Sequence, residues 1–545
     1  MEDFSLKDRI FSFKDDMLKS KRYWILSLIL ILMAFFATMT MSNYKAPRFE
    51  IGALIFSCIA SIFLITFYHS HRDEKNFYKT AFLVILLFGI VFSFLTPIMC
   101  NDYEFENFIR SEMTSNGVIN PEFHSEPFTL ETIDYDGYYL TVQTAYDLAK
   151  DGKNASSYID DYIYFTVNDT NKHSVSDYID MDLKDSSIFK TDADTQPINT
   201  TLVKFHSAFA QNPFFAYIAS AMGMAIAKLL SLNAIWILWL GRIFNATLYA
   251  VLAGYAIKKT PILKVPLFVI ACIPAAISQA SSISVDPLVN GLVILAIAYF
   301  LMFYKSPKNS LDHKDILKFS LLVVLIGLCK IPYCALIFLL VFIPQDNFKQ
   351  RKYYYSIGLI VLMLIGIMAL WYTFYVSPGI HNSWRYSLYL SQVKVGAQNQ
   401  INYMMGHSTK TLASIGNLFS NLDTILKLES GYGTKFISLY LLFSGVIYLL
   451  YPVEKIRHKT KIGAFIVFCM VYFGSYIFYI LTWSKVGRLN AYVPPSYFFP
   501  LLGLIPIFLG INHVQKDTTE IDYYIVMLAI TFIIFRLLTL ALLVY

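Results

Sequence analysis

The sequence predicts an all-α polytopic membrane protein, and three observations support this fold class. Of the 545 residues, 56% are hydrophobic and only 15% are charged, with a mean hydropathy of +0.51. Apolar runs of about 20 residues, the length of a membrane-spanning helix, recur along the whole chain. Residues 101–212 hold 20 acidic and 7 basic residues, whereas the rest holds 18 and 37. This basic excess lies in short segments between apolar runs, which indicates cytoplasmic loops rather than a nucleic-acid-binding surface.

The positions of the basic loops predict about 13 transmembrane helices. An apolar segment at 213–230 is expected to be interfacial or re-entrant, because two full crossings before Lys258 would place that lysine outside. The resulting segments are a cytoplasmic N-terminus at 1–22, an extra helical hairpin at 23–78, the first core helix at 79–99, an extracytoplasmic loop at 100–212, core helices at 213–376, a second extracytoplasmic loop at 377–433 and C-terminal helices at 434–545.

Two details of the core helices bear on function. Helices at 265–283 and 287–304 are predicted to form a hairpin with Asp286 at its outer tip. The apolar run 317–344 is interrupted by a Lys-Ile-Pro sequence that begins at Lys330. Basic loops flank both ends of this run, so we expect two short helices that meet at an outward-facing break. The six cysteines lie almost entirely in apolar runs and are interpreted as small apolar residues.

Charged residues at the expected outer face are the candidates for chemistry. A carboxylate there could deprotonate an acceptor hydroxyl, and nearby cations could hold a departing lipid phosphate. Simpler explanations exist for each group: a solvated helix exit, a helix cap before a proline, or a lysine that reaches the interface. The groups are Asp102, Glu104 and Glu106 after the first core helix, Asp286, Lys330, Arg385, Lys394, Lys485 and Arg488, with Arg242 inside a helix.

Several short motifs, taken in order, resemble the bacterial membrane proteins of the family "domain of unknown function 2142" over about residues 80–510. Tyr103 and Asn107 stand where that family has Asp and His, with Asp102 one residue out of register. The motifs are Pro97 followed by Glu104, Arg110 and Gly117; Asn212-Pro213; Arg242 with Asn245; the stretch from Ser278 to Asn290 around Asp286; Lys330 with Pro332 and Tyr333; Gln400 with Asn402 and Tyr403; and Pro494 to Pro500.

This family is similar to C-type glycosyltransferases, and the resemblance implies a GT-C-like fold that transfers a sugar from a polyprenyl-phosphate donor. The acceptor would be an extracytoplasmic glycan, a cell-wall polymer or a lipid, and the protein would reside in the cell membrane among membrane lipids. The implied roles are Asp102 or Glu104 as general base, Arg242, Lys330 and Arg488 on the donor phosphate, and Arg110, Asp286 and Gln400 as further substrate-binding residues.

The resemblance names no certain cofactor and leaves metal dependence open, because two carboxylates near a phosphate could hold a divalent cation. Two alternatives remain open at this point. A flippase or transporter of lipid-linked sugars would share the basic outer cavity but would not need a carboxylate at 102 or 104. A catalytically degenerate member of the family would act as a structural partner of another enzyme.

Overall fold

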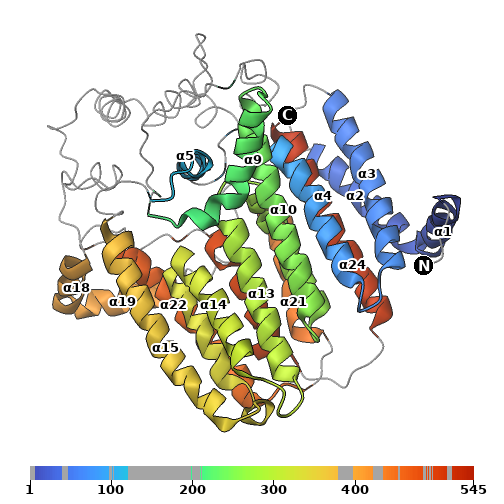
Figure 1. Ribbon diagram of the computed structural model, residues 1–545. Coiled ribbons are helices and arrows are strands. Elements are labelled where there is room, and N and C mark those ends of the chain that lie inside the picture. The colour runs from blue at the N-terminus through green and yellow to red at the C-terminus, as the bar shows by residue number, and fades with distance from the viewer. Residues whose placement is uncertain are drawn as a thin grey trace, which may run out of the picture.

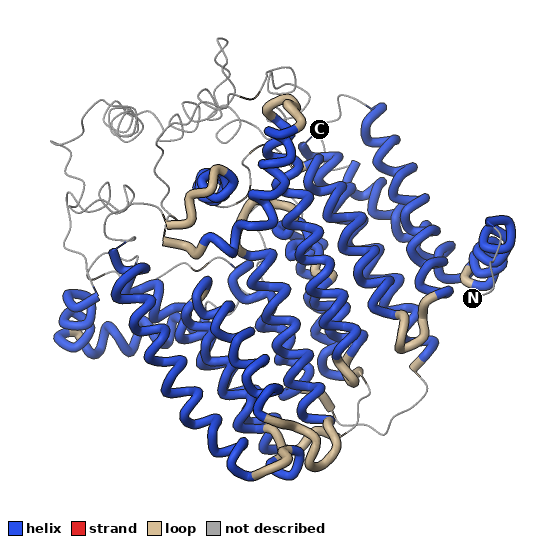
Figure 2. The backbone as a smooth tube through the Cα atoms, in the orientation of Figure 1, coloured by secondary structure: helices blue, strands red, loops and turns tan. Residues whose placement is uncertain are grey.

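A computed structural model of the chain consists of helices and connecting loops in the part that it describes (Figures 1 and 2). The described residues are 6–39, 47–96, 104–120, 211–378, 397–420, 434–451, 455–482, 495–511 and 518–544, with a few isolated positions between them. These ranges contain no β-strand, and an isolated parallel bridge joins Leu311 to Phe348. The all-α fold class is therefore confirmed.

Eight described helices are long and apolar enough to cross a membrane. Other predicted membrane segments correspond to shorter apolar helices, whose length does not show whether they cross. The total of 13 crossings therefore stays a prediction. The eight are α2 (Lys21–Met39), α3 (Pro47–Ser70), α4 (Phe77–Leu95), α10 (Ile235–Lys259), α13 (Asp286–Lys305), α15 (Arg351–Trp371, continued by the π-helical turn η6, Tyr372–Val376), α22 (His458–Thr482) and α24 (Thr519–Val544).

The shorter helices cap the ends of the long ones or lie beside them. They are α1 (Leu6–Lys19), α5 (Glu104–Ser115), η3 (Phe214–Tyr217), α9 (Ile218–Leu229), α11 (Lys264–Ala271), α12 (Pro274–Ala280), α14 (His313–Cys329), η4 (Ile331–Phe342), η5 (Gln345–Asn347), α18 (Ala397–Gly406), α19 (Ser408–Ser420), α21 (Thr434–Leu450), η7 (Pro495–Leu504) and α23 (Ile505–Phe508).

The predicted continuous helix at 265–283 is wrong, because the segment folds as the two short helices α11 and α12. Pro274 begins α12, and a proline disfavours helical backbone in the residue before it. Ile273 accordingly has φ −55° and ψ 122°, outside the helical region. A non-helical stretch, 281–285, then separates α12 from α13. A continuous helix would have used the backbone N–H and carbonyl groups of these residues in its own hydrogen bonds. In the non-helical stretch, such groups can bind side chains inside the bundle.

The break at Lys330 is present, although its second half is a 3₁₀-helix rather than the expected α-helix. Lys330 has extended backbone angles (φ −141°, ψ 91°) between α14 and η4. Pro332 has no N–H group, so the carbonyl of Leu328 loses the partner that an α-helix would provide four residues on. The indole N–H of Trp371 on α15 donates to that carbonyl at 3.1 Å. A neighbouring helix thus satisfies the polar group that the proline frees, as membrane-embedded breaks require.

Helix α10 lies at the centre of the bundle, with α4 and α13 along its sides and α9 across its first turns (Figure 1). Gly223 of α9 allows the closest of these approaches, since a Cβ there would lie 2.3 Å from the carbonyl oxygen of Leu240. On one side of the bundle, α2, α3 and α24 pack against one another, and both α3 and α24 also contact α4. Three buried hydroxyls join them: Ser27 contacts Thr531 at 2.7 Å and Ser61 at 2.8 Å.

Candidate functional site

Glu104 is the first residue of α5, and its carboxylate is completely enclosed. It forms a two-pronged ion pair with Arg242 of α10, in which Nε donates to Oε1 at 2.7 Å and Nη2 donates to Oε2 at 2.6 Å. Both side chains are 0% exposed. The backbone N–H of Ile283 also donates to Oε1 at 3.1 Å. A solvated helix exit is therefore the wrong interpretation for Glu104.

Arg242 also satisfies the open end of α4. Its Nη1 group donates to the carbonyl of Thr96 at 2.7 Å and to that of Ser93 at 3.3 Å. The last carbonyls of a helix have no partner within the helix, and a cation there is favourable. Arg242 therefore joins the end of α4, the start of α5 and the middle of α10 through one buried guanidinium.

A second ion pair joins Asp286, the first residue of α13, to Lys330 at the break between α14 and η4. The amide nitrogen of Gln279 donates to the other oxygen of Asp286. The ammonium of Lys330 lies 3.8 Å from the centre of the Tyr497 ring, a cation–π contact. The N-cap of α13 is Val285, and the Asp286 carboxylate binds Lys330 and Gln279 rather than the backbone of α13, so the simple helix-cap explanation is wrong.

The two ion pairs differ in access to their surroundings. In the second pair the side chains keep some exposure, 8% for Lys330 and 16% for Asp286, whereas the first pair has none. Lys330 points toward Asp286 rather than reaching for an interface, so the snorkelling explanation is wrong. The neighbouring Tyr333 hydroxyl donates to the Tyr497 carbonyl and so fixes the aromatic ring beneath the lysine.

The non-helical segment 281–285 connects the two pairs. The backbone N–H of Ile283, within this segment, binds Glu104, and Asp286 is the first residue after the segment. Asn245 of α10 holds the same segment, donating to the carbonyls of Ser282 at 2.9 Å and Ser284 at 3.3 Å. The short stretch of backbone from Ile283 to Asp286 therefore links the two ion pairs.

Arg110 of α5 is also fully buried, and it organises the chain around it. Its guanidinium donates to the carbonyls of Asn212 at 3.2 Å and Ile119 at 3.0 Å. Burial lowers the pKa of this guanidinium, while the neighbouring Tyr217 and Tyr375 oppose that effect. Asn107, at the position where the family has His, accepts a hydrogen bond from the Tyr217 hydroxyl at 2.6 Å.

The remaining predicted residues lie elsewhere or outside the described part of the chain. Gln400 of α18 is buried and accepts a hydrogen bond from the backbone N–H of Gly487 at 2.9 Å. Gly487 has φ +89°, a conformation that favours glycine. Asp102 and Arg488 are outside the described residues, so their predicted roles stay predictions. Within the described ranges, no group of three or more His, Cys, Asp or Glu residues could hold a metal ion.

Sequence reasoning missed three contributors to the site. Gln279 and Tyr497 complete the surroundings of the second ion pair, and both stood in recognised motifs without an assigned role. Trp371 was missed altogether, although Pro332, four residues after Leu328, signals a carbonyl that needs an external donor. Nothing local in the sequence indicates which of the tryptophans supplies it.

The fold and site define an all-α, multi-spanning membrane protein with two linked ion pairs among its core helices. The model of one family, described as "Predicted membrane protein (DUF2142)", matches residues 142–505, and the chain belongs to this family. The match includes Arg242, Asp286 and Lys330, whereas α4 and Glu104 precede it, although the resemblance was expected from about residue 80. No curated protein and no solved structure matches the chain.

Proposed function

We propose that this protein is a membrane-embedded glycosyltransferase that moves a sugar from a polyprenyl-phosphate donor to an extracytoplasmic glycan, cell-wall polymer or lipid. The observation that supports this most is the Asp286–Lys330 pair at a helix break, with Gln279 and Tyr497 around it. Charged groups inside a membrane-spanning bundle are costly, and they commonly mark substrate or ion sites. This pair is the partly accessible one of the two.

The proposed step divides the work between the two charges. An acceptor hydroxyl oxygen attacks the anomeric carbon of the donor sugar, and the bond from that carbon to the phosphate oxygen breaks. Lys330 holds the lipid phosphate that leaves with the bonding electron pair, through a charge-assisted hydrogen bond. A carboxylate takes the proton of the acceptor hydroxyl.

The geometry adds Asp286 to the candidate bases. Both oxygens of Glu104 are engaged by Arg242 and one also by Ile283, so Glu104 can accept a proton only if Arg242 releases it. For the same reason Arg242 holds a donor phosphate only in a rearranged state. Both oxygens of Asp286 are also engaged, by Lys330 and Gln279, but its side chain keeps 16% exposure. Lys330 would free one of these oxygens when it turns to the donor phosphate. Asp102 remains the alternative base.

The test uses the purified full-length chain in lipid vesicles with a panel of polyprenyl-phosphate sugars. We expect transfer by the unaltered protein, and loss of transfer in Asp286→Asn and Lys330→Met. Lys349→Met is the matched control, because Lys349 forms an exposed pair with Asp312 elsewhere in the molecule. Undiminished transfer in both site variants would exclude this site. Movement of lipid-linked sugar across the vesicle without donor consumption would favour the flippase, and no effect on any donor would favour the structural partner.

A further inference from the structure

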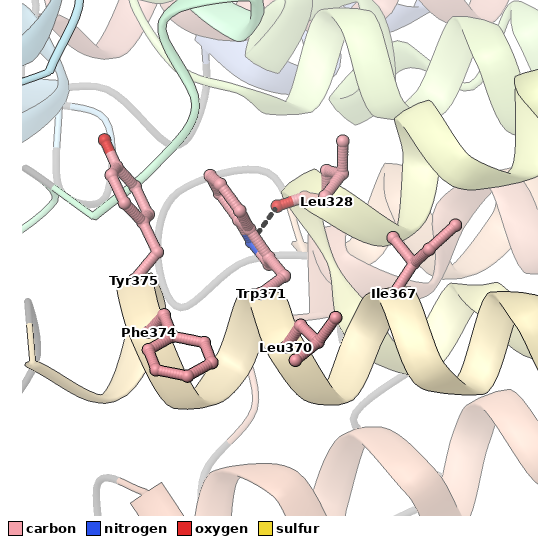
Figure 3. Close-up of a pocket in the computed structure, with 6 residues that line it drawn as sticks. All are labelled: Leu328, Ile367, Leu370, Trp371, Phe374 and Tyr375. Atoms are coloured by element: carbon pink, nitrogen blue, oxygen red, sulfur yellow. Dashed lines mark hydrogen bonds between the residues drawn. The ribbon is translucent and has the colours of Figure 1, made fainter.

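A pocket of about 430 Å³ lies directly beside the break that carries Lys330. Leu328 of α14 forms one wall, and the last turns of α15 with η6 form the other (Figure 3). In Figure 3, Trp371 and Tyr375 project from the same side of that helix, and their rings stack with centres 4.3 Å apart. The volume falls in the range of small-ligand sites, roughly 300–1,000 Å³. The six lining residues are Leu328, Ile367, Leu370, Trp371, Phe374 and Tyr375.

The helix that forms this pocket is built to face hydrocarbon. Within its span, Arg351–Val376, an 18-residue window has a mean hydropathy of 2.3, and only 17% of that window is buried. Leu362 and Phe374, for example, are 67% and 75% exposed. A membrane-spanning helix with such a surface meets lipid chains rather than water. The ligand that fits an apolar pocket on this face is therefore a hydrocarbon chain.

The pocket wall and the helix break form one mechanical unit. Trp371 lines the pocket, and its indole N–H holds the Leu328 carbonyl that Pro332 leaves without a helical partner. Leu328 and Lys330 are two residues apart, a distance of at most about 7 Å along an extended chain. An occupant of the pocket would therefore contact Trp371, whose hydrogen bond holds the Leu328 carbonyl two residues before Lys330.

Charge complementarity identifies the other end of the occupant. Lys330 keeps a small exposed fraction, and its only ion-pair partner in the described chain is Asp286. Lys330 follows Leu328 of the pocket wall by two residues, so a lipid with its chain in the pocket would place its head group at this break. Phosphate is the head group that a lysine binds as a point charge.

We propose that this pocket binds the hydrocarbon chain of a single-chain lipid phosphate whose phosphate faces Lys330, and that Trp371 positions the break for it. The choice of a lipid with a single hydrocarbon chain rests on the proposed function, because the polyprenyl phosphate that carries the sugar has one such chain. The site itself rests on the pocket, the exposed apolar helix and the Trp371 contact. A two-chain phospholipid bound as a structural lipid is the competing occupant.

The test is photolabelling of the full-length protein in nanodiscs with farnesyl phosphate that carries a diazirine on its chain. We expect the label on peptides around Leu328 and 367–375, displaced by untagged farnesyl phosphate but not by inorganic phosphate. Ile367→Trp, which fills the pocket, should reduce labelling at least fivefold. Leu362→Trp, on the same helix outside the pocket, should leave it within twofold. Thermal stability and elution volume confirm that both variants are folded.

Two further arms examine the head group and the number of chains. Diazirine-bearing farnesol, which lacks the phosphate, should label at least fivefold more weakly, and Lys330→Met should remove this difference. Equal labelling by the alcohol would overturn the role of Lys330. Displacement by phosphatidylglycerol as efficient as that by farnesyl phosphate would overturn the single-chain occupant.

Because labelling does not require turnover, the two proposals fail separately. Labelling in the pocket without transfer of any sugar would support the lipid site and refute the transferase. Sugar transfer that continues in Ile367→Trp, with no label in the pocket of the unaltered protein, would refute the lipid site and support the transferase.

Discussion

The two ion pairs of the core have similar chemistry and different surroundings. Glu104 and Arg242 are fully enclosed, and between them they bind one another, a backbone N–H and two helix-end carbonyls. Asp286 and Lys330 keep some exposure and rest against an amide and an aromatic ring. The first pair is thus fully enclosed, whereas the second keeps a small exposed fraction.

This difference separates stability from function. Removing one member of a buried, saturated pair leaves an uncompensated charge and several unpaired groups. Removing one member of a partly exposed pair leaves a group that solvent or lipid head groups can reach. We therefore expect the first pair to affect mainly folding and the second mainly activity.

The largest effect should come from Arg242→Met. Loss of this guanidinium leaves Glu104 buried without a counter-charge, so the free energy of unfolding should fall by about 3–5 kcal/mol. Denaturant unfolding in detergent measures the change. The exposed Lys349→Met should alter it by less than about 1 kcal/mol. Equal stability of the two variants would show that the first pair is not structural and would return Glu104 to the leading position as base.

Lys330→Met, in contrast, should lower activity more than stability. We expect at least a hundredfold loss of sugar transfer, equivalent to about 2.7 kcal/mol of transition-state stabilisation. The free energy of unfolding should fall by less than in Arg242→Met, because Asp286 keeps an exposed fraction. Transfer rates and unfolding curves are measured on the same preparations. If Lys330→Met keeps full activity while Glu104→Gln abolishes it, the assignment of the two pairs is reversed.

The scaffold behind the second pair can be tested with two glycines of α22. A Cβ at Gly463 would lie 2.2 Å from the Phe342 ring of η4, so Gly463→Ala should cost about 1–3 kcal/mol by overpacking. At Gly474 the nearest neighbour is the Cβ of Pro332 at 3.6 Å, so Gly474→Ala should be neutral or slightly stabilising. Unfolding curves compare them. A large loss at Gly474 instead would mean that α22 and η4 pack more tightly near the break than near Phe342.

The smallest expected effect concerns the helix break itself. Trp371→Phe keeps a ring but removes the donor to the Leu328 carbonyl, which should cost about 1 kcal/mol. Trp239→Phe is the matched control, since the Trp239 indole nitrogen is buried with no hydrogen-bond partner among the described residues. Thermal unfolding distinguishes the two. A cost for Trp239→Phe that equals the cost for Trp371→Phe would assign the effect to ring packing.

The sequence by itself determined the class of the protein and the helix break at Lys330. Long apolar runs predict membrane helices because hydrocarbon accepts only backbone that is internally hydrogen-bonded. The break at Lys330 followed from a proline within such a run, since a proline removes a donor wherever it stands. Membership in the DUF2142 family was likewise recognisable from short motifs in order along the chain.

The tertiary structure alone decided which charges meet. Glu104 and Arg242 are 138 residues apart, and Asp286 and Lys330 are 44 apart. No local pattern links partners at such separations, because their pairing depends on how the helices pack side by side. Packing also placed Ile283 against Glu104, whereas the split of the expected helix at 265–283 follows locally from Pro274. Glu104, predicted as a candidate base with a solvated helix exit as the simpler explanation, lies fully buried against Arg242, because α10 carries Arg242 to the end of α4.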